Sequence, residues 1–133
     1  MDVLSGRIIL RPADPDTTLA FYRDQLGLAI SREYPGGTVF FAGGTLIEVA
    51  AHLSEGATPS TTVLWLQVRD LATTAAELTS RGVRIVREAR TEPWGLMEMH
   101  IADPDGTTII VVQVPADHPL RKDLRTSDQP RVT

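Results

Sequence analysis

Apolar and polar residues alternate over most of this chain, and glycine and proline residues separate the alternating stretches. Alternation is typical of strands with one buried face, whereas apolar residues three or four positions apart indicate a helix. The first half of the chain is therefore predicted to run strand, helix, strand, strand, strand. We expect the strands at 6–12, 28–35, 37–43 and 45–51, and the helix at 16–27 with Leu19, Tyr22 and Leu26 on one face. Asp14 followed by Pro15 is typical of a helix start, because Asp caps the first turn and Pro suits its first position.

The second half of the chain repeats this order of elements. Strands are predicted at 61–68, 83–89, 96–102 and 107–114, and a helix at 70–82 that begins with Asp70 as its cap and ends at Gly82. The residues Asp14, Thr17, Thr18 and Ala20 of the first helix start recur at the same spacing as Asp70, Thr73, Thr74 and Ala76. We infer an internal duplication, in which two supersecondary units share one core. The segment that follows is polar with several prolines, so we expect a loose tail, with a short helix around 119–124 as an alternative.

The composition limits the classes of function. A chain of 133 residues is the size of one domain, and its 42% hydrophobic and 23% charged residues are ordinary for a soluble globular protein. A net charge of -4 offers no basic field to nucleic acid or to an anionic membrane, and we expect neither as a partner. The chain has no cysteine, which excludes a disulfide framework, a thiolate nucleophile and cysteine-bound metals. We find no signal peptide in its opening residues and expect a cytoplasmic protein.

The alternation also predicts which side chains face away from the helices. Each unit has one helix, which must cover one face of its sheet and leave the other face as a floor. In the strand at 96–102 the apolar set Met97, Met99 and Ile101 is expected to meet the helix, so Glu98 and His100 look the other way. The same reasoning places Arg7, Ile9, Glu48, Trp65 and Ile110 on the floor. Phe40 and Phe41 have opposite parities, so one of them should reach the floor; we take Phe41, although the pattern does not decide between them.

A floor that mixes apolar and polar groups suits a small-molecule site, and it suits a dimer partner or second sheet equally well. Arg7 is expected either to pair with Glu48 or to grip an anionic or carbonyl group of a ligand. Trp65 and Trp94 either stack on a flat ligand or fill the core and a loop. His100 with Glu98 reads as a general acid–base pair or as a hydrogen-bonded polar patch within reach of Glu48.

Three motifs carry a resemblance to a known family: "DPDTTLAFYRDQLGL" at the first helix, "PWG" at 93–95 and "DPDG" at 103–106. With the duplicated units, they resemble the vicinal oxygen chelate superfamily, which includes glyoxalase and bleomycin-resistance proteins. The resemblance implies an α+β fold of two tandem βαβββ modules whose curved mixed sheets surround a cleft. It implies one domain over 1–115, with modules at about 5–55 and 60–115, followed by a polar tail at 116–133. It also implies a homodimer, with the cleft formed within one chain or across two.

Enzymes of that family hold a divalent metal with four side chains, and the resemblance places those positions on Arg7, Glu48, Val63 and Ile110. Only Glu48 has an atom that could ligate, so we predict no metal, no cofactor and no catalytic residue. Metal-free members include resistance proteins that sequester drugs as homodimers. We expect this chain to bind and sequester a flat, largely apolar natural product, which is antibiotic resistance by binding. The alternative is a metal-independent isomerase, cyclase or lyase that uses His100 with Glu98 or Glu48 as acid and base. The residues predicted to bind the ligand are Arg7, Ile9, Phe41, Glu48, Trp65, Trp94, Glu98, His100 and Ile110.

Overall fold

The structure is a computed structural model that describes residues 1–121 of the chain. Its first half contains β1 (Ile8–Leu10), α1 (Pro15–Ala20), the π-helical turn η1 (Phe21–Gln25), β2 (Ile30–Tyr34), β3 (Gly37–Ala42), β4 (Thr45–Val49) and the 3-10 helix η2 (Ala51–Gly56). Its second half contains β5 (Val63–Gln67), α2 (Leu71–Ser80), β6 (Ile85–Thr91), β7 (Met97–Ala102), β8 (Thr108–Gln113) and the 3-10 turn η3 (Pro119–Arg121). The predicted order of elements is therefore confirmed in both halves.

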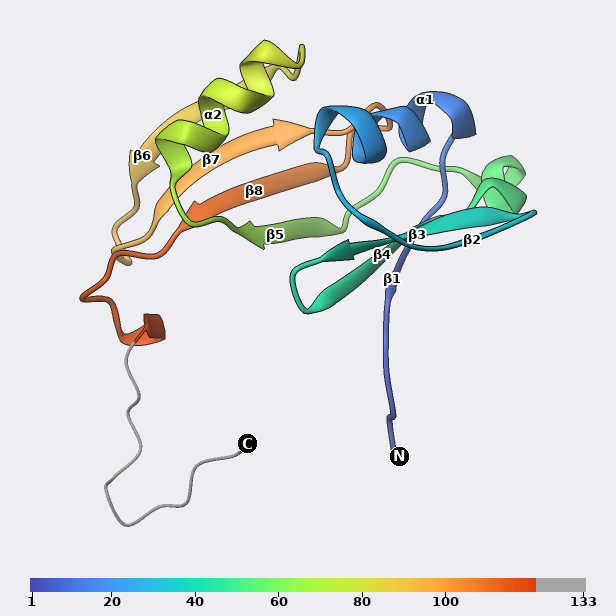
Figure 1. Cartoon of the computed structure of the whole chain (residues 1–133), viewed down its shortest axis with the longest axis horizontal. Coiled ribbons are helices and arrows are strands. Elements are labelled where there is room, and N and C mark those ends of the chain that lie inside the picture. Colours follow the sequence, from blue (N-terminus) through green and yellow to red (C-terminus); the bar gives the residue numbers. More distant parts are fainter. Residues whose placement is uncertain (122–133) are drawn as a thin grey trace.

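Each half forms a four-stranded mixed sheet. The strand orders are β1-β4-β3-β2 and β5-β8-β7-β6, with β1 parallel to β4, β5 parallel to β8 and the other pairs antiparallel. The two orders are equivalent position by position, as a duplication requires. This is the predicted α+β fold of two tandem βαβββ modules. In Figure 1 both helices lie along the upper side of the molecule, and the N-terminal segment leaves from the opposite side.

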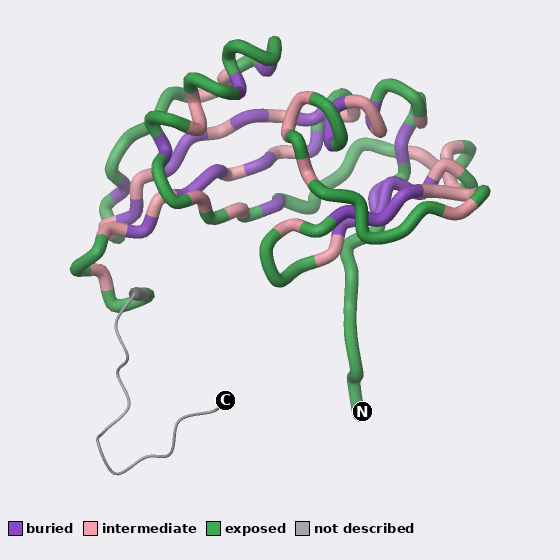
Figure 2. The backbone as a smooth tube through the Cα atoms, in the orientation of Figure 1, coloured by how far each residue is buried: buried purple, intermediate pink, exposed green. Residues whose placement is uncertain are grey.

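The helix-facing sides of both sheets contribute to one hydrophobic core. Phe40, Ile47 and Val49 enter it from the first sheet, and Met99 and Ile109 enter it from the second. Figure 2 shows this burial along the inner strands β3, β4, β7 and β8, while the segment before β1 is exposed. The alternation predicted this division of the strands correctly, and the structure decides between the two phenylalanines. Phe40 is fully buried in the core, and Phe41 is about half exposed on the other face.

The first predicted helix, in contrast, is not one continuous α-helix. After Ala20 it continues as a π-helical turn, in which the Leu26 amide donates to the Phe21 carbonyl at 2.8 Å. The wider turn allows two consecutive aromatic residues, Phe21 and Tyr22, to be buried together, with their rings edge-to-face at 5.1 Å. An apolar pattern read at the α-helical period contains no signal for this turn. The segment expected around 119–124 is a 3-10 turn over Pro119–Arg121, and residues 122–133 of the predicted tail lie outside the described residues.

The two helix starts also differ in their capping. Asp70 caps α2 as predicted, because its carboxylate accepts the Thr73 amide at 2.9 Å. Asp14 stands at the equivalent position of α1 but accepts no backbone amide, and its carboxylate binds the Thr17 hydroxyl at 2.7 Å instead. Asp14 therefore stands at the cap position, but the prediction that its side chain caps the first turn is wrong, because it accepts no backbone amide.

The "DPDG" loop between β7 and β8 joins the second module to the start of α1 in the first module. Asp105 accepts from the Ala13 amide at 2.8 Å and from the Thr18 hydroxyl at 2.6 Å, and Asp103 accepts from the buried Tyr22 hydroxyl at 2.7 Å. Burial, with Asp103 beside it, raises the pKa of Tyr22 above its ordinary value, so the phenol stays protonated and donates. Within the described residues, no helix is long and apolar enough to cross a membrane.

Candidate functional site

Each sheet has one face that the helices leave uncovered, and we refer to these as the first and second open faces. Residues in register across neighbouring strands lie on the same face. On the first open face Ile9 pairs with Glu48, which pairs with Val39 on the next strand. On the second open face the register forms one row across all four strands, consisting of Trp65, Ile110, His100 and Arg87. The predicted ligand-binding residues thus belong to two surfaces, one in each module.

A closed polar cluster occupies the first open face. Arg7 donates to Glu48 Oε1 at 2.8 Å, and the Tyr34 hydroxyl donates to Glu48 Oε2 at 2.6 Å. Glu48 is buried, and the hydrogen bond from Tyr34, together with the Arg7 guanidinium, holds the pKa of its carboxyl below the ordinary value. Both carboxylate oxygens are therefore engaged. Of the two alternatives for Arg7, the structure contains the ion pair.

Tyr34 was not predicted to belong to this cluster, although the hairpin beside it carries a signal. Tyr34 pairs with Gly37 across the β2–β3 hairpin, and a Cβ added at Gly37 would stand 2.9 Å from the Tyr34 hydroxyl. The missing side chain leaves room for the phenol to lie over the sheet and reach Glu48. The same Cβ would stand 2.7 Å from the Val49 carbonyl, so the position requires glycine for two reasons.

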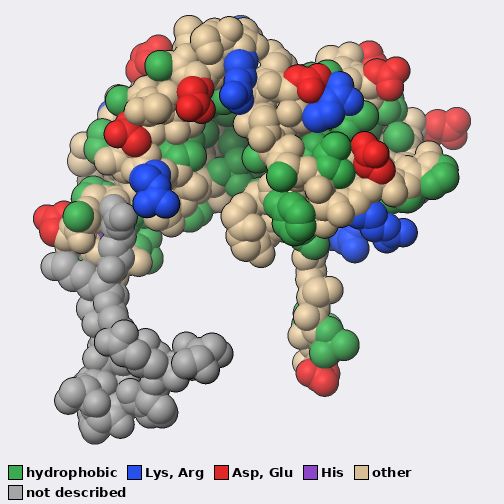
Figure 3. Space-filling model, viewed as in Figure 1, with side chains coloured by type: hydrophobic (Ala, Val, Ile, Leu, Met, Phe, Trp, Pro, Cys, Tyr) green, Lys and Arg blue, Asp and Glu red, His purple; other side chains and the backbone are tan. Residues whose placement is uncertain are grey.

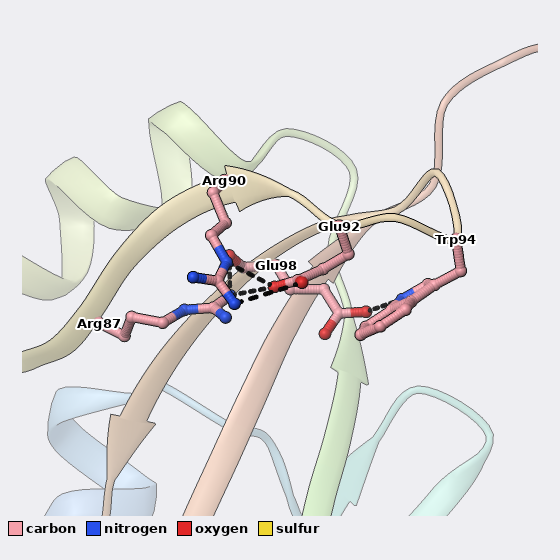
Figure 4. A network of polar contacts seen from close by, with 5 residues as sticks. All are labelled: Arg87, Arg90, Glu92, Trp94 and Glu98. Atoms are coloured by element: carbon pink, nitrogen blue, oxygen red, sulfur yellow. Dashed lines mark hydrogen bonds and ion pairs between the residues drawn. The ribbon is translucent and has the colours of Figure 1, made fainter.

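A second polar cluster lies at the end of the second open face, where the loop between β6 and β7 turns (Figure 4). Glu92 forms ion pairs with Arg87 at 2.6 Å and with Arg90 at 3.1 Å. Arg87 also donates to the Glu98 carbonyl at 2.9 Å, while the indole N–H of Trp94 donates to Glu98 Oε2 at 2.7 Å. The hydrogen bond from Arg90, with Arg87 beside it, holds the pKa of Glu92 below its ordinary value. Sequence reasoning identified Glu98 and Trp94 but neither their hydrogen bond nor the arginines around them.

His100 lies in the middle of the second open face and is half-buried. Burial lowers its pKa below the ordinary value of 6.5, and the Arg87 guanidinium lowers it further, so the imidazole is neutral at pH 7. Within the described part of the chain the His100 imidazole has no hydrogen-bond partner. The expected hydrogen-bonded patch of His100 with Glu98 is therefore not formed, because Glu98 is bound to Trp94. Their expected reach to Glu48 is not seen either, since that carboxylate is held by Arg7 and Tyr34.

Large apolar side chains are exposed on both open faces. Ile9 and Phe41 are 51% and 49% exposed on the first, and Val63 and Trp65 are 51% and 46% exposed on the second. Trp94, in the loop beside Glu98, is 58% exposed. A single exposed apolar residue needs no explanation, but several on one surface indicate a site for a ligand or a partner.

A cavity lies elsewhere, between the edge strand β5 and the β3–β4 hairpin. It has a volume of about 760 Å³, and Leu28, Ala42, Leu64 and Leu66 contribute to its lining. Figure 3 shows hydrophobic side chains in the recess between the two halves of the molecule. Trp65 is the one predicted ligand-binding residue that lines this cavity. The open faces are surfaces in a single chain, and a second body is needed to enclose a ligand on them.

The positions at which the family resemblance would place a metal do not fit a divalent ion. Arg7 is a permanent cation, Val63 and Ile110 have no donor atom, and Glu48 has both oxygens engaged. A catalytic metal needs about three protein ligands and an open position. Among residues 1–121, no group of three or more His, Asp or Glu side chains is placed to hold a metal ion.

Comparison with known proteins agrees with the fold and the motifs. The family model described as "Glyoxalase/Bleomycin resistance protein/Dioxygenase superfamily" matches residues 5–111. Among solved structures, the bleomycin resistance determinant encoded on transposon Tn5 is 27% identical with a TM-score of 0.68, over 86% of this chain and 98% of that one. A glyoxalase-related enzyme from Fulvimarina pelagi is 22% identical with a TM-score of 0.69, over 87% and 91%. A superfamily member from Sphaerobacter thermophilus is 22% identical with a TM-score of 0.70, over 85% and 98%. The search of curated proteins gave no match. The chain belongs to the glyoxalase/bleomycin resistance protein/dioxygenase superfamily.

Proposed function

We propose that this protein binds a flat, largely apolar small molecule without a metal and sequesters it unchanged. The observation that carries the proposal is the pairing of Glu48 with Arg7 and Tyr34 on the first open face. The one carboxylate that could have ligated a metal is satisfied by protein donors, and the surrounding Ile9 and Phe41 are exposed. Such a surface attracts a guest by shape and desolvation.

The proposal includes a homodimer as the functional form, located in the cytoplasm. An open face is uncovered in one chain, so burial of a ligand requires a cover. The first open face of one copy against the second open face of another would enclose a space between Phe41 and Trp65. Pairing of the two faces would also remove the exposed apolar side chains of both from water.

Planar antibiotics are the natural class of guest to test first. The Tn5-encoded neighbour is a bleomycin resistance determinant, and an aromatic ring stacks on tryptophan with little loss of conformational entropy. We infer that Trp65 supplies such a stacking surface on the edge strand of the second open face, beside Ile110. Resistance would then follow from the lowered free concentration of the drug.

The test is a calorimetric titration with bleomycin and other planar antibiotics, followed by mass spectrometry of the recovered compound. Binding at micromolar concentration or tighter, unchanged by chelator, with an unmodified compound, supports the proposal. Trp65→Ala should weaken binding at least tenfold, on the scale of a central aromatic contact. Val86→Ala is the control, because Val86 is also exposed but its neighbour Arg87 occupies the open face. A chemically altered compound would overturn sequestration.

One observation favours a second candidate, a metal-independent isomerase, cyclase or lyase. His100 is neutral, half-buried and without a partner within residues 1–121, which are conditions that suit a general base. Glu48 does not suit that role, because its lowered pKa makes it a weak base. This candidate predicts turnover that persists in chelator and is lost in His100→Ala. Turnover that survives in His100→Ala would eliminate it.

A further inference from the structure

The two carboxylates on the open faces are not equivalent. Glu48 has both oxygens bonded, to Arg7 and to Tyr34. Glu98 uses only Oε2, which accepts from the Trp94 indole, and within the described chain Oε1 has no partner. Figure 4 shows this second oxygen directed away from the indole, with no contact drawn to either arginine. The residue as a whole is only 5% exposed, but Oε1 is not among the buried side-chain atoms that lack a partner. This oxygen is therefore the part of Glu98 that water or a ligand can reach.

Within the described chain Glu98 Oε1 receives no protein donor, and because this oxygen is accessible, water or a ligand can supply one. The nearby arginines do not reach it. Arg87 and Arg90 both direct their guanidinium groups to Glu92, and Arg87 reaches Glu98 only at its backbone carbonyl.

The surroundings of Glu98 suit a cationic guest. The Trp94 ring is held beside the carboxylate by its own hydrogen bond and is 58% exposed. Gln67 and Val112 stand in the register row of Glu98, and Trp65 stands in the next row along β5. A carboxylate beside an exposed aromatic ring favours a positively charged group, through charge-assisted hydrogen bonding and the attraction between a cation and a ring. The net charge of the chain, -4, also attracts a cation at longer range.

We infer that the guest of this site is a planar aromatic cation, whose positive charge lies against Glu98 Oε1 and whose ring packs on Trp94. The inference rests on the proposed function and narrows it, because it names the charge of the ligand as well as its shape. It also assigns Glu98 and Trp94 a joint role in ligand selection. Glu48 has no part in that selection, since its charge is already neutralised by Arg7.

Three probes of nearly the same shape test the charge preference: the cation 10-methylacridinium, the neutral 9-anthracenemethanol and the anion anthracene-9-carboxylate. Binding is measured by titration of probe fluorescence at fixed ionic strength, with the full chain. The cation should bind the wild type at least tenfold more tightly than either of the other probes, on the scale of a charged hydrogen bond. The affinity for the cation should fall severalfold when NaCl is raised from about 50 to about 500 mM, because salt screens the attraction between the cation and the carboxylate.

Matched variants locate the preference. Glu98→Gln keeps the size of the side chain and an oxygen acceptor for Trp94, and should reduce cation binding to the level of the neutral probe. Glu88→Gln removes the same charge from an exposed position of β6 and should leave all three affinities unchanged. Trp94→Phe removes the indole donor but retains a ring and the whole carboxylate. The preference for the cation should therefore persist in Trp94→Phe. This variant also allows the charge preference to be tested if Glu98→Gln fails to fold.

The outcomes separate this inference from the proposed function. Any of three outcomes overturns the charge preference while aromatic binding stands. The cation and the neutral probe bind equally, Glu98→Gln and Glu88→Gln have equal effects, or the anion binds most tightly. Absence of binding for all three probes overturns the charge preference and counts against a flat guest, and therefore against the proposed function as well.

Discussion

The hydrogen bond between Tyr22 and Asp103 permits a direct test of how the two modules are held together. Tyr22 belongs to the π-helical turn of the first module and is fully buried, and Asp103 begins the "DPDG" loop of the second. Tyr22→Phe removes one oxygen and leaves the ring in place against Phe21 and Phe40. The change therefore isolates the hydroxyl from the packing of the ring.

The expected cost follows from the surroundings of Asp103. Its Oδ1 accepts from the amides of Asp105 and Thr107, both at 2.9 Å, so that oxygen stays satisfied in the variant. Its Oδ2 loses the Tyr22 donor at 2.7 Å and remains buried. Hydrogen bonds to charged groups contribute about 1.5–3 kcal/mol, so Tyr22→Phe should lower the free energy of unfolding by about 2 kcal/mol. For a chain of this length, that loss corresponds to a fall in Tm of about 8 °C.

Urea denaturation at one protein concentration measures this loss, and a double-mutant cycle assigns it to the pair. Asp103→Asn is the second arm of the cycle, and the two changes together should cost less than the sum of the single changes by about 1 kcal/mol or more. A loss below about 0.5 kcal/mol in Tyr22→Phe, or costs that simply add, would show that this contact does not join the modules.

Two further predictions concern charge and assembly. The native pKa of Glu48 lies below its ordinary value of 4.5, so in acid the unfolded state binds more protons than the folded state. The stabilisation from Glu48 is therefore present at neutral pH and is lost as the pH falls below about 4.5. Glu48→Gln should reduce the difference in unfolding free energy between pH 7 and about pH 3.5, and an undiminished difference would refute this role. The proposed homodimer should elute at twice the chain mass in light scattering, and Ile9→Glu should shift it toward monomer whereas Val86→Glu should not. A wild-type monomer would contradict the dimer.

Alternation along the strands was sufficient to predict much of the candidate site. It placed Met99 and Ile101 in the core and Glu98 and His100 on the opposite face, because a side-chain period of two leaves no other choice once one face is buried. It failed to decide between Phe40 and Phe41, since both are apolar and either could be buried. The register decides, because Phe40 pairs with the buried Ile47.

Contacts between distant parts of the chain were outside the reach of this reasoning. The capping prediction for Asp14 followed a local pattern that holds in α2, but at α1 the Asp14 carboxylate accepts from the Thr17 hydroxyl and not from a backbone amide. Similarly, Trp94 occupies the partner position at Glu98 that the sequence suggested for His100. Local propensity does not specify which of several polar groups meets a carboxylate in three dimensions, since that depends on how loops pack.

The different treatment of the two open-face carboxylates links the fold to the proposed function. Glu48 is a buried charge, and such a charge destabilises the fold unless donors compensate it. Arg7 and Tyr34 supply those donors, which makes the first open face self-sufficient without a guest. Glu98, in contrast, receives one side-chain donor within the described residues, from Trp94, whose ring is exposed. Its Oε1 is accessible, so it can bind a ligand without any rearrangement of the two polar clusters.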